Sequence, residues 1–225
     1  MIETKELKKT YKQGSLKVKA VDNVNLKISD GEFTAIVGPS GSGKTTLLNC
    51  IGGLDNPTSG KVIIDGELIS SYSSNQMIKF RLNNIGFVFQ SYNLIPVLTA
   101  KENIEMVMLM QGYNKKDMEK RSSDLLNEVG MGDMSKRRPS ELSGGQQQRV
   151  AVARSLASKP KFILADEPTA NLDSKSTAKL LDIMSRLNKQ EKITFVFSTH
   201  DQRVIDRARR VVTLVDGKII KDIKK

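Results

Sequence analysis

Short apolar runs recur along the chain and predict buried strands. Four of them are continuous or nearly so, which is typical of strands buried on both faces of a parallel sheet covered by helices. They lie at residues 33–37, 85–89, 162–165 and 193–197. By contrast, Val24, Leu26 and Ile28 alternate with polar residues and predict a half-buried strand.

Helical spacing dominates the middle of the chain. Residues 100–111 and 116–129 predict two helices. Apolar positions then recur at helical spacing after Ser143 until Pro160 ends the pattern. A helical segment therefore interrupts the series of strands.

These patterns together predict a single α/β domain over residues 1–225. We assign residues 1–90 and 160–225 to a sheet-based core, and about 91–159 to an inserted helical subdomain. With 38% hydrophobic residues, the chain can bury such a core without disulfides or metals. Cys50 is the only cysteine, and its apolar neighbours favour a small core residue over a reactive thiol.

The net charge of +11 leaves several partner classes open. The basic clusters could meet nucleic acid, could meet an anionic membrane surface, or could simply be solvated. Apart from Tyr11, no aromatic residue interleaves them as a base-stacking platform requires. No run approaches the roughly 18 apolar residues that span a bilayer, and the N-terminus lacks a signal-peptide core. We therefore expect a soluble, cytoplasmic chain.

The segment GPSGSGKT at residues 38–45 has the pattern of a Walker A phosphate-binding loop. It lies between a predicted strand and a predicted helix, the order that such a loop needs. Its glycines let backbone N–H groups point at phosphate oxygens, and the helix dipole favours the anion. We expect Lys44 to reach the β- and γ-phosphates of ATP and Thr45 to bind Mg²⁺. The predicted ATP-binding residues here are Gly38, Ser40, Gly41, Ser42, Gly43, Lys44, Thr45 and Thr46.

Polar residues at the ends of apolar strands supply the candidate catalytic groups. Asp166 and Glu167 follow the strand 162–165, at the edge of the sheet where ligands bind. We expect Asp166 to bind ATP by holding its Mg²⁺, and Glu167 to act as the general base for the attacking water. At two other strand ends, His200 is expected to contact the γ-phosphate, and Gln90 to contact Mg²⁺ and the water.

A second anion-binding motif, LSGGQQQR at residues 142–149, opens the helix after Ser143. Ser143 is a good N-cap, and the two glycines leave backbone N–H groups uncovered. This string is the signature motif of the ATP-binding cassette (ABC) ATPases, which the chain resembles from end to end. The resemblance implies a P-loop NTPase (RecA-like) core, an N-terminal antiparallel β-subdomain and an inserted α-helical subdomain.

The resemblance also implies roles for the remaining motifs. Tyr11 is similar to the aromatic residue that stacks on adenine, and Asp173 belongs to a segment resembling the D-loop. In this family two cassettes pack head to tail, so that the signature of one subunit caps the ATP of the other. We therefore expect a homodimer of ATPase subunits in which the signature residues serve the partner's ATP. These residues are Ser143, Gly144, Gly145 and Gln146.

The sequences of three segments indicate one branch of the family. Residues 53–60, 85–96 and 98–100 are similar to the ATPases of lipoprotein release, macrolide-type export and cell division (LolD-, MacB- and FtsE-type). The resemblance implies a motor subunit on the cytoplasmic face of the membrane, bound to an integral permease through a coupling helix, with no direct contact to cargo. Export and a regulatory role without transport both stay open.

A soluble ABC ATPase that acts on nucleic acid is the alternative class. Family members of that kind insert long coiled coils before the signature or carry two cassettes in one chain. Here about a hundred positions separate the two motifs, and no sustained heptads occur between them. We therefore expect no nucleic-acid partner.

The permease contact is expected beside Gln90, in a groove formed by residues 91–99 and the start of the helical subdomain. The alternative is that residues 91–99 only pack within the subdomain. Three methionines on the next helix could add an adaptable surface to the contact, or could simply divide between core and ordinary surface. The groove candidates are Tyr92, Leu94, Ile95 and Val97, and the methionines are Met106, Met108 and Met110.

Overall fold

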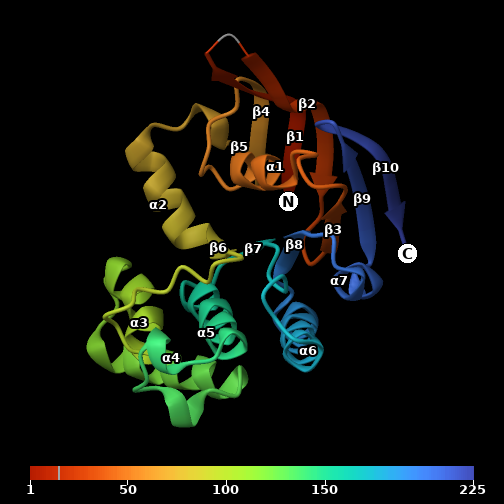
Figure 1. The fold of residues 1–225 in the computed structure, drawn as a ribbon. Helices are drawn as coiled ribbons and strands as arrows, with labels where there is room; N and C mark the ends of the chain where they lie inside the picture. The colour runs from red at the N-terminus through yellow and green to blue at the C-terminus, as the bar shows by residue number, and fades with distance from the viewer. Residues whose placement is uncertain (15) are drawn as a thin grey trace.

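The computed structural model of the chain describes residues 1–14 and 16–225, and these form two sheets (Figure 1). The strands of the larger sheet are β3 (Phe33–Val37), β6 (Ile85–Val88), β7 (Phe162–Asp166), β8 (Thr194–Ser198), β9 (Arg210–Val215) and β10 (Lys218–Lys224). Their order is β10-β9-β3-β8-β7-β6. All neighbouring pairs are parallel except β9 and β10.

The smaller sheet is antiparallel and has the order β2-β1-β4-β5. Its strands are β1 (Ile2–Gln13), β2 (Leu16–Ile28), β4 (Ser59–Ile64) and β5 (Glu67–Leu68). The predicted alternation is confirmed in β2, where Val24, Leu26 and Ile28 are buried between exposed or half-buried neighbours.

The helices begin at residues that cap them well. Thr99 and Ser143 each form a capping box with a residue three positions on, and Asp173 accepts from two backbone N–H groups. The helices are α1 (Lys44–Ile51), α2 (Ser74–Asn84), α3 (Ala100–Met110), α4 (Lys115–Glu128), α5 (Gly144–Ala157), α6 (Ser174–Glu191) and α7 (Gln202–Arg207). Short 3₁₀ turns lie at Ile69–Ser71, Gly132–Met134 and Pro139–Glu141.

Apolar side chains cover both faces of the larger sheet, which explains the continuous apolar runs. In β8, Phe195 and Phe197 point to the core shared with α3 to α6, while Val196 points to the core beneath α1 and the smaller sheet. Cys50 lies in the second core at 2% exposure. Burial raises the pKa of its thiol to about 12, so Cys50 is a core residue and not a reactive thiol.

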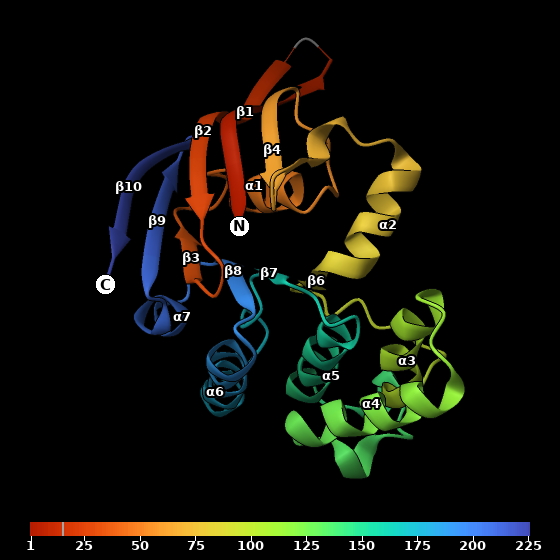
Figure 2. The same cartoon turned by 180° about the vertical axis from the view of Figure 1, so that it is seen from behind.

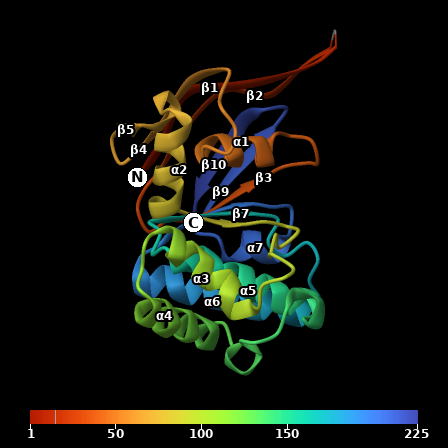
Figure 3. The same ribbon diagram turned by 90° about the vertical axis from the view of Figure 1, so that its left-hand side faces the viewer.

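The views agree on three groups of elements. Helices α3, α4 and α5 lie together, with the antiparallel sheet at the opposite end of the molecule and the parallel strands between them (Figures 1 and 2). Viewed from the side, the helices form a layer beneath the parallel strands, and α1 lies under the antiparallel sheet (Figure 3). The predicted fold class is therefore confirmed. Within the described ranges, no helix is both long and apolar enough to cross a bilayer.

Arg210 joins the two sheets near the C-terminus through a 7% exposed side chain. Its guanidinium donates to Asp222 on β10 at 2.8 and 2.7 Å, to Glu32 at 2.8 Å and to the Lys27 carbonyl at the end of β2. Burial alone would raise the pKa of Glu32, but the hydrogen bond and charge of Arg210 outweigh burial and lower it. The same guanidinium lowers the pKa of Asp222.

We predict that Arg210→Met lowers the free energy of unfolding by about 2 to 3 kcal/mol at pH 7, because two carboxylates lose a shielded partner. Lowered carboxylate pKa values stabilise the fold at neutral pH, and this stability is lost as the pH falls below about 4. The acid sensitivity should therefore be weaker in the variant. Urea denaturation across pH measures both effects.

The control is Arg207→Met, which breaks an exposed ion pair with Asp182 and should cost less than about 1 kcal/mol. Equal stability of the two variants, or an unchanged pH profile in Arg210→Met, would contradict the assignment.

Candidate functional site

The glycine loop between β3 and α1 lies against backbone carbonyls of two other strands. A Cβ at Gly38 would stand 2.0 Å from the Leu214 carbonyl oxygen, and one at Gly43 would stand 1.9 Å from the Ala20 carbonyl oxygen. Gly43 also has a φ of 98°, which disfavours any other residue. The loop is therefore possible only with glycine at these two positions.

An open cavity of about 750 Å³ lies over this loop. Lys44 is 8% exposed, and its ammonium donates to the carbonyls of Gly38 and Pro39, each at 2.9 Å. The charge is thus held inside the curl of the loop, where a phosphate would meet it. The predicted residues that line the cavity are Gly38, Ser40, Gly41, Gly43, Lys44, Thr45, Thr46, Gln90, Glu167 and His200. Ser42 is instead buried at 2% exposure.

Thr45 and Asp166 meet although they are far apart in the sequence. The Thr45 hydroxyl lies 2.9 and 3.0 Å from the two carboxylate oxygens of Asp166, and the Gln90 side chain lines the same cavity. Hydroxyl, carboxylate and amide oxygens are ligands that Mg²⁺ accepts alongside water and phosphate. The residues present therefore fit a magnesium ion bound together with a nucleotide.

Glu167 directs its carboxylate at His200. The Glu167 Oε1 and His200 Nδ1 atoms are 2.7 Å apart, and the Thr199 hydroxyl donates to Oε2 at 3.3 Å. Glu167 has a left-handed φ of 45°, and its backbone N–H donates to the Ser198 carbonyl at 2.8 Å. Its side chain is only 14% exposed, whereas that of His200 is 72% exposed. A shielded, oriented carboxylate beside an exposed histidine suits a general base at a cavity wall.

Asp201 fixes the loop that carries His200. Its carboxylate accepts from the Thr169 hydroxyl at 2.7 Å and from the Arg203 guanidinium at 2.7 Å. The hydrogen bond from Arg203 lowers the pKa of Asp201 to about 2, so this carboxylate stays ionised. The loops that follow β7 and β8 are therefore tied together beside Glu167.

Tyr11 lies beside the cavity and not in its lining. It pairs across the β-hairpin with Val18, which does line the cavity. Its hydroxyl donates to Asp55 at 2.5 Å, and the Lys9 ammonium lies 4.9 Å from the ring centroid. The ring is 41% exposed, so one face can still receive a flat partner.

The signature residues lie apart from this cavity. Among the described residues that line it, none comes from 142–149. Ser143 caps α5, accepting from the Gln146 backbone N–H at 3.3 Å. A Cβ on Gly144 would stand 2.7 Å from the Tyr92 hydroxyl, and one on Gly145 would stand 2.8 Å from the Ser176 hydroxyl. The glycines therefore also serve packing, which their sequence pattern did not reveal.

Asp173 likewise acts at a helix terminus. Its carboxylate accepts from the backbone N–H groups of Lys175 and Ser176, both at 2.9 Å, and so caps α6. Since Ser176 also contacts Gly145, the D-loop-like segment and the signature motif share one surface.

The sequence patterns did not indicate five residues that line the cavity: Val18, Lys19, Ala20, Pro39 and Asp216. The first three follow Tyr11 across the hairpin of β1 and β2, so the strand pairing of Tyr11 could have indicated them. Asp216 belongs to the Asp-Gly turn between β9 and β10, a turn signal visible in the sequence. The turn signal, however, does not indicate that Asp216 lies near the phosphate loop.

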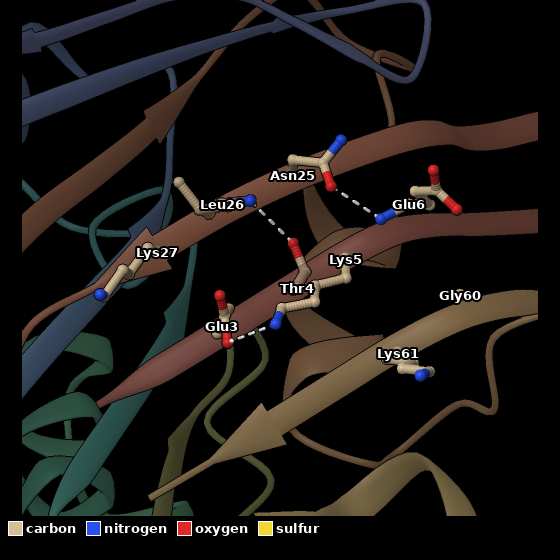
Figure 4. A pocket seen from close by; sticks show the side chains of 9 residues that line it. All are labelled: Glu3, Thr4, Lys5, Glu6, Asn25, Leu26, Lys27, Gly60 and Lys61. Carbon is tan, nitrogen blue, oxygen red and sulfur yellow. Dashed lines mark hydrogen bonds and ion pairs between the residues drawn. The ribbon is translucent and has the colours of Figure 1, made fainter. Parts of the chain in front are cut away.

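A second hollow, of about 790 Å³, lies on the antiparallel sheet (Figure 4). Two pairs of its polar groups interact: Lys5 pairs with Glu3 at 3.4 Å, and the Glu6 backbone N–H donates to Asn25 at 2.8 Å. It contains no predicted site residue, and we do not assign a ligand to it.

A family model described as ABC transporter matches residues 21–170, a range that includes the phosphate loop, Gln90, the signature motif and Glu167. The chain belongs to the ABC transporter family. The cassette is 43% identical to the lipoprotein-releasing system ATP-binding protein LolD of Syntrophus aciditrophicus, over 98% of this chain and 99% of that protein. It is also 43% identical to the macrolide export ATP-binding/permease protein MacB of Syntrophobacter fumaroxidans, over 97% of this chain and 31% of that protein.

A solved structure agrees in fold along the whole chain. The dimeric post-hydrolysis state of the ATP-binding cassette MJ0796, from Methanocaldococcus jannaschii, was determined with ADP and Pi. It superposes with a TM-score of 0.94 at 43% identity, covering 100% of this chain and 98% of that one. The cassette is therefore the ATP-binding, ATP-hydrolysing subunit of an ABC transporter, as the motifs predicted.

We predict that Gly43→Ala lowers the affinity for a fluorescent ATP analogue by more than about 100-fold, because the new methyl group displaces the phosphate loop from β2. The control is Gly66→Ala, which has a φ of 85° and open space around its Cβ. The control should lose about 1 kcal/mol of stability and keep its nucleotide affinity. Similar affinities for all three proteins would show that the close approach to Ala20 is unnecessary.

Proposed function

We propose that the cassette is the motor of a membrane exporter of the mechanotransmission type, peripheral to the cytoplasmic face of the membrane. The similarity to LolD and MacB over nearly the whole chain supports this branch. A regulatory role in a cell-division-type complex is the second candidate. In either case the cassette binds neither cargo nor nucleic acid, and it acts on an integral permease.

Within each cassette, the residues of the cavity take the following proposed roles. Lys44 and the loop N–H groups bind the β- and γ-phosphates, and Tyr11 stacks on adenine. Thr45, Gln90 and Asp166 hold Mg²⁺, which neutralises phosphate charge as the terminal phosphoryl group is transferred. Glu167 takes the proton of the attacking water, and His200 positions that water and the γ-phosphate.

The separation of the two anion sites carries the proposal of a dimer. Gly38 to Thr45 form a complete phosphate cradle, yet the signature lies on another surface of the same chain. The related MJ0796 cassette is dimeric, which supports a head-to-tail homodimer here. In that arrangement Ser143, Gly144, Gly145 and Gln146 contact the partner's ATP, and Asp173 lies in the same interface. ATP binding closes the dimer, and hydrolysis reopens it.

We predict that Glu167→Gln lowers kcat by about 10²- to 10⁴-fold, because the amide cannot accept the water proton. Trapped before hydrolysis, this variant should elute as a dimer in sizing chromatography with ATP and as a monomer without it. The double variant with Lys44→Ala is the control and should remain monomeric in both conditions. A Glu167→Gln protein that stays monomeric at high concentration with ATP would refute the dimer.

The permease contact is proposed at a groove formed by β6, α3 and the end of α5. This groove has a volume of about 250 Å³, and Phe87, Phe89, Met106 and Val107 supply its apolar lining. Stacked rings of Phe87 and Phe89, 5.7 Å apart, form one wall. An apolar pocket of this kind suits a short coupling helix.

The structure reduces the set of residues predicted to contact the permease. Met108 is fully buried and is not free to meet a permease, whereas Leu94 packs against the core with part of its side chain still exposed. Val97 is 72% exposed and stays a candidate, although it does not line this groove. Residues 91–159 then form the proposed helical subdomain that moves against the core of 1–90 and 160–225.

We predict that Met106→Lys abolishes copurification in detergent with the membrane protein that the wild type recovers, because it places a charge in the apolar groove. Met110→Lys is the control: it lies on the same helix, is 59% exposed and does not line the groove. Both variants should hydrolyse ATP like the wild type. Equal recovery of the permease with both variants would exclude this groove, and no recovery with the wild type would argue against the motor role.

A further inference from the structure

Gln148 is a buried amide on α5 to which the proposed mechanism gives no role. Its side chain is fully buried, and its Nε2 donates to the Pro168 carbonyl at 2.9 Å and to the Phe89 carbonyl at a longer 3.5 Å. Because both neighbours are carbonyl oxygens, the NH₂ group must face them. Its Oε1 finds no hydrogen-bond partner in the described part of the chain. An apolar residue would avoid that unpaired oxygen, so the two donated bonds are the reason for an amide here.

The two carbonyls stand next to catalytic residues. Phe89 precedes Gln90, and Pro168 follows Glu167. The strands β6 and β7 that lead to them are neighbours, pairing Val88 with Ala165. Beyond the paired residues, the Gln148 amide on α5 connects the segment after β6 to the segment after β7 by donating to both carbonyls.

The segment after β6 has further bonds to α5. Arg154 donates to the Tyr92 carbonyl at 2.9 Å and also to the Asn93 carbonyl. Tyr92 and Asn93 have left-handed φ values of 60° and 49°. From the other side, Asn171 donates to the Gln90 carbonyl at 3.1 Å. The backbone around Gln90 is therefore attached both to the signature helix and to the loop after Glu167.

We propose that Gln148 is a positioning residue that couples the signature of a cassette to the catalytic groups of its own ATP site. This inference rests on the proposed dimer, in which the partner's ATP binds at the Ser143 end of α5. A shift of α5 on contact with that ATP moves the carbonyls beside Gln90 and Glu167 with it. Each subunit thereby senses the nucleotide of the other, and the two sites hydrolyse ATP cooperatively.

The test compares Gln148→Met with the wild type in steady-state ATP hydrolysis. Methionine preserves the approximate volume but donates no hydrogen bond. The separated subunits should bind an ATP analogue with unchanged affinity, since the phosphate loop is intact. We expect kcat to fall by about 10- to 100-fold and the Hill coefficient to fall from above 1 to 1. A purely structural role would lower the melting temperature and leave the Hill coefficient of the folded protein unchanged.

The matched control is Gln111→Met. That amide also bridges backbone carbonyls, Leu82 at 3.2 Å and Ser158 at 3.5 Å, and its Oε1 is likewise unpaired in the described residues. Because none of these partners lines the nucleotide cavity, this variant should retain wild-type cooperativity. If Gln148→Met does not fold, Gln148→Asn replaces it, since its amide is one methylene too short to reach both carbonyls.

A test of dimerisation distinguishes failure of this inference from failure of the proposed dimer. In the Glu167→Gln background, Gln148→Met should still dimerise with ATP. If Glu167→Gln alone does not dimerise, the proposed function fails. If it dimerises but Gln148→Met keeps the wild-type Hill coefficient, or the wild type has a coefficient of 1, only the coupling is refuted. Loss of the dimer in Gln148→Met alone would assign Gln148 to closure and would also overturn the coupling.

Discussion

The close approach of the phosphate loop to two backbone carbonyls is the contact on which the rest of this structure depends. Ala20 belongs to the antiparallel sheet and Leu214 to the parallel sheet, so the loop joins the two. The Gly217 N–H donates to the Ser42 carbonyl at 3.0 Å, which adds the β9–β10 turn to the same junction. Because this junction positions β2, it also places Val18 and Tyr11 beside the cavity. The phosphate loop and the proposed adenine contact therefore rest on one set of glycine contacts.

The catalytic groups depend in turn on the parallel order of β3, β8 and β7. Their carboxyl ends meet at one edge and bring Lys44, His200 and Asp166 within reach of one phosphate chain. Glu167 takes a left-handed φ there, which costs roughly 1 kcal/mol for a residue with a side chain. Its bonds to Ser198, Thr199 and His200 offset this cost and aim the carboxylate into the cavity.

The signature helix α5 connects the signature motif to the catalytic segment around Gln90. In the proposed dimer its first turn presents Ser143 to the partner, while Gln148 and Arg154 donate hydrogen bonds to the backbone on either side of Gln90. A helix that contacts another subunit at one end and the catalytic segment along its side is suited to carry information between two ATP sites. The groove proposed for the permease adjoins the same segment, since Phe89 and Asn93 line it.

Local patterns in the sequence were enough for the fold class and the phosphate loop, and they predicted the catalytic residues, because strand burial, glycine spacing and strand-end polarity are read from neighbouring residues. The sequence also identified the family through the signature string. It could not reveal that Val18 and Asp216 line the cavity, that Met108 is buried, or that Gly144 packs on Tyr92. Those facts depend on how distant segments pack, since helical spacing does not say which face meets which neighbour. Gln148 is the clearest case: its role depends on two carbonyls that only the folded chain brings together.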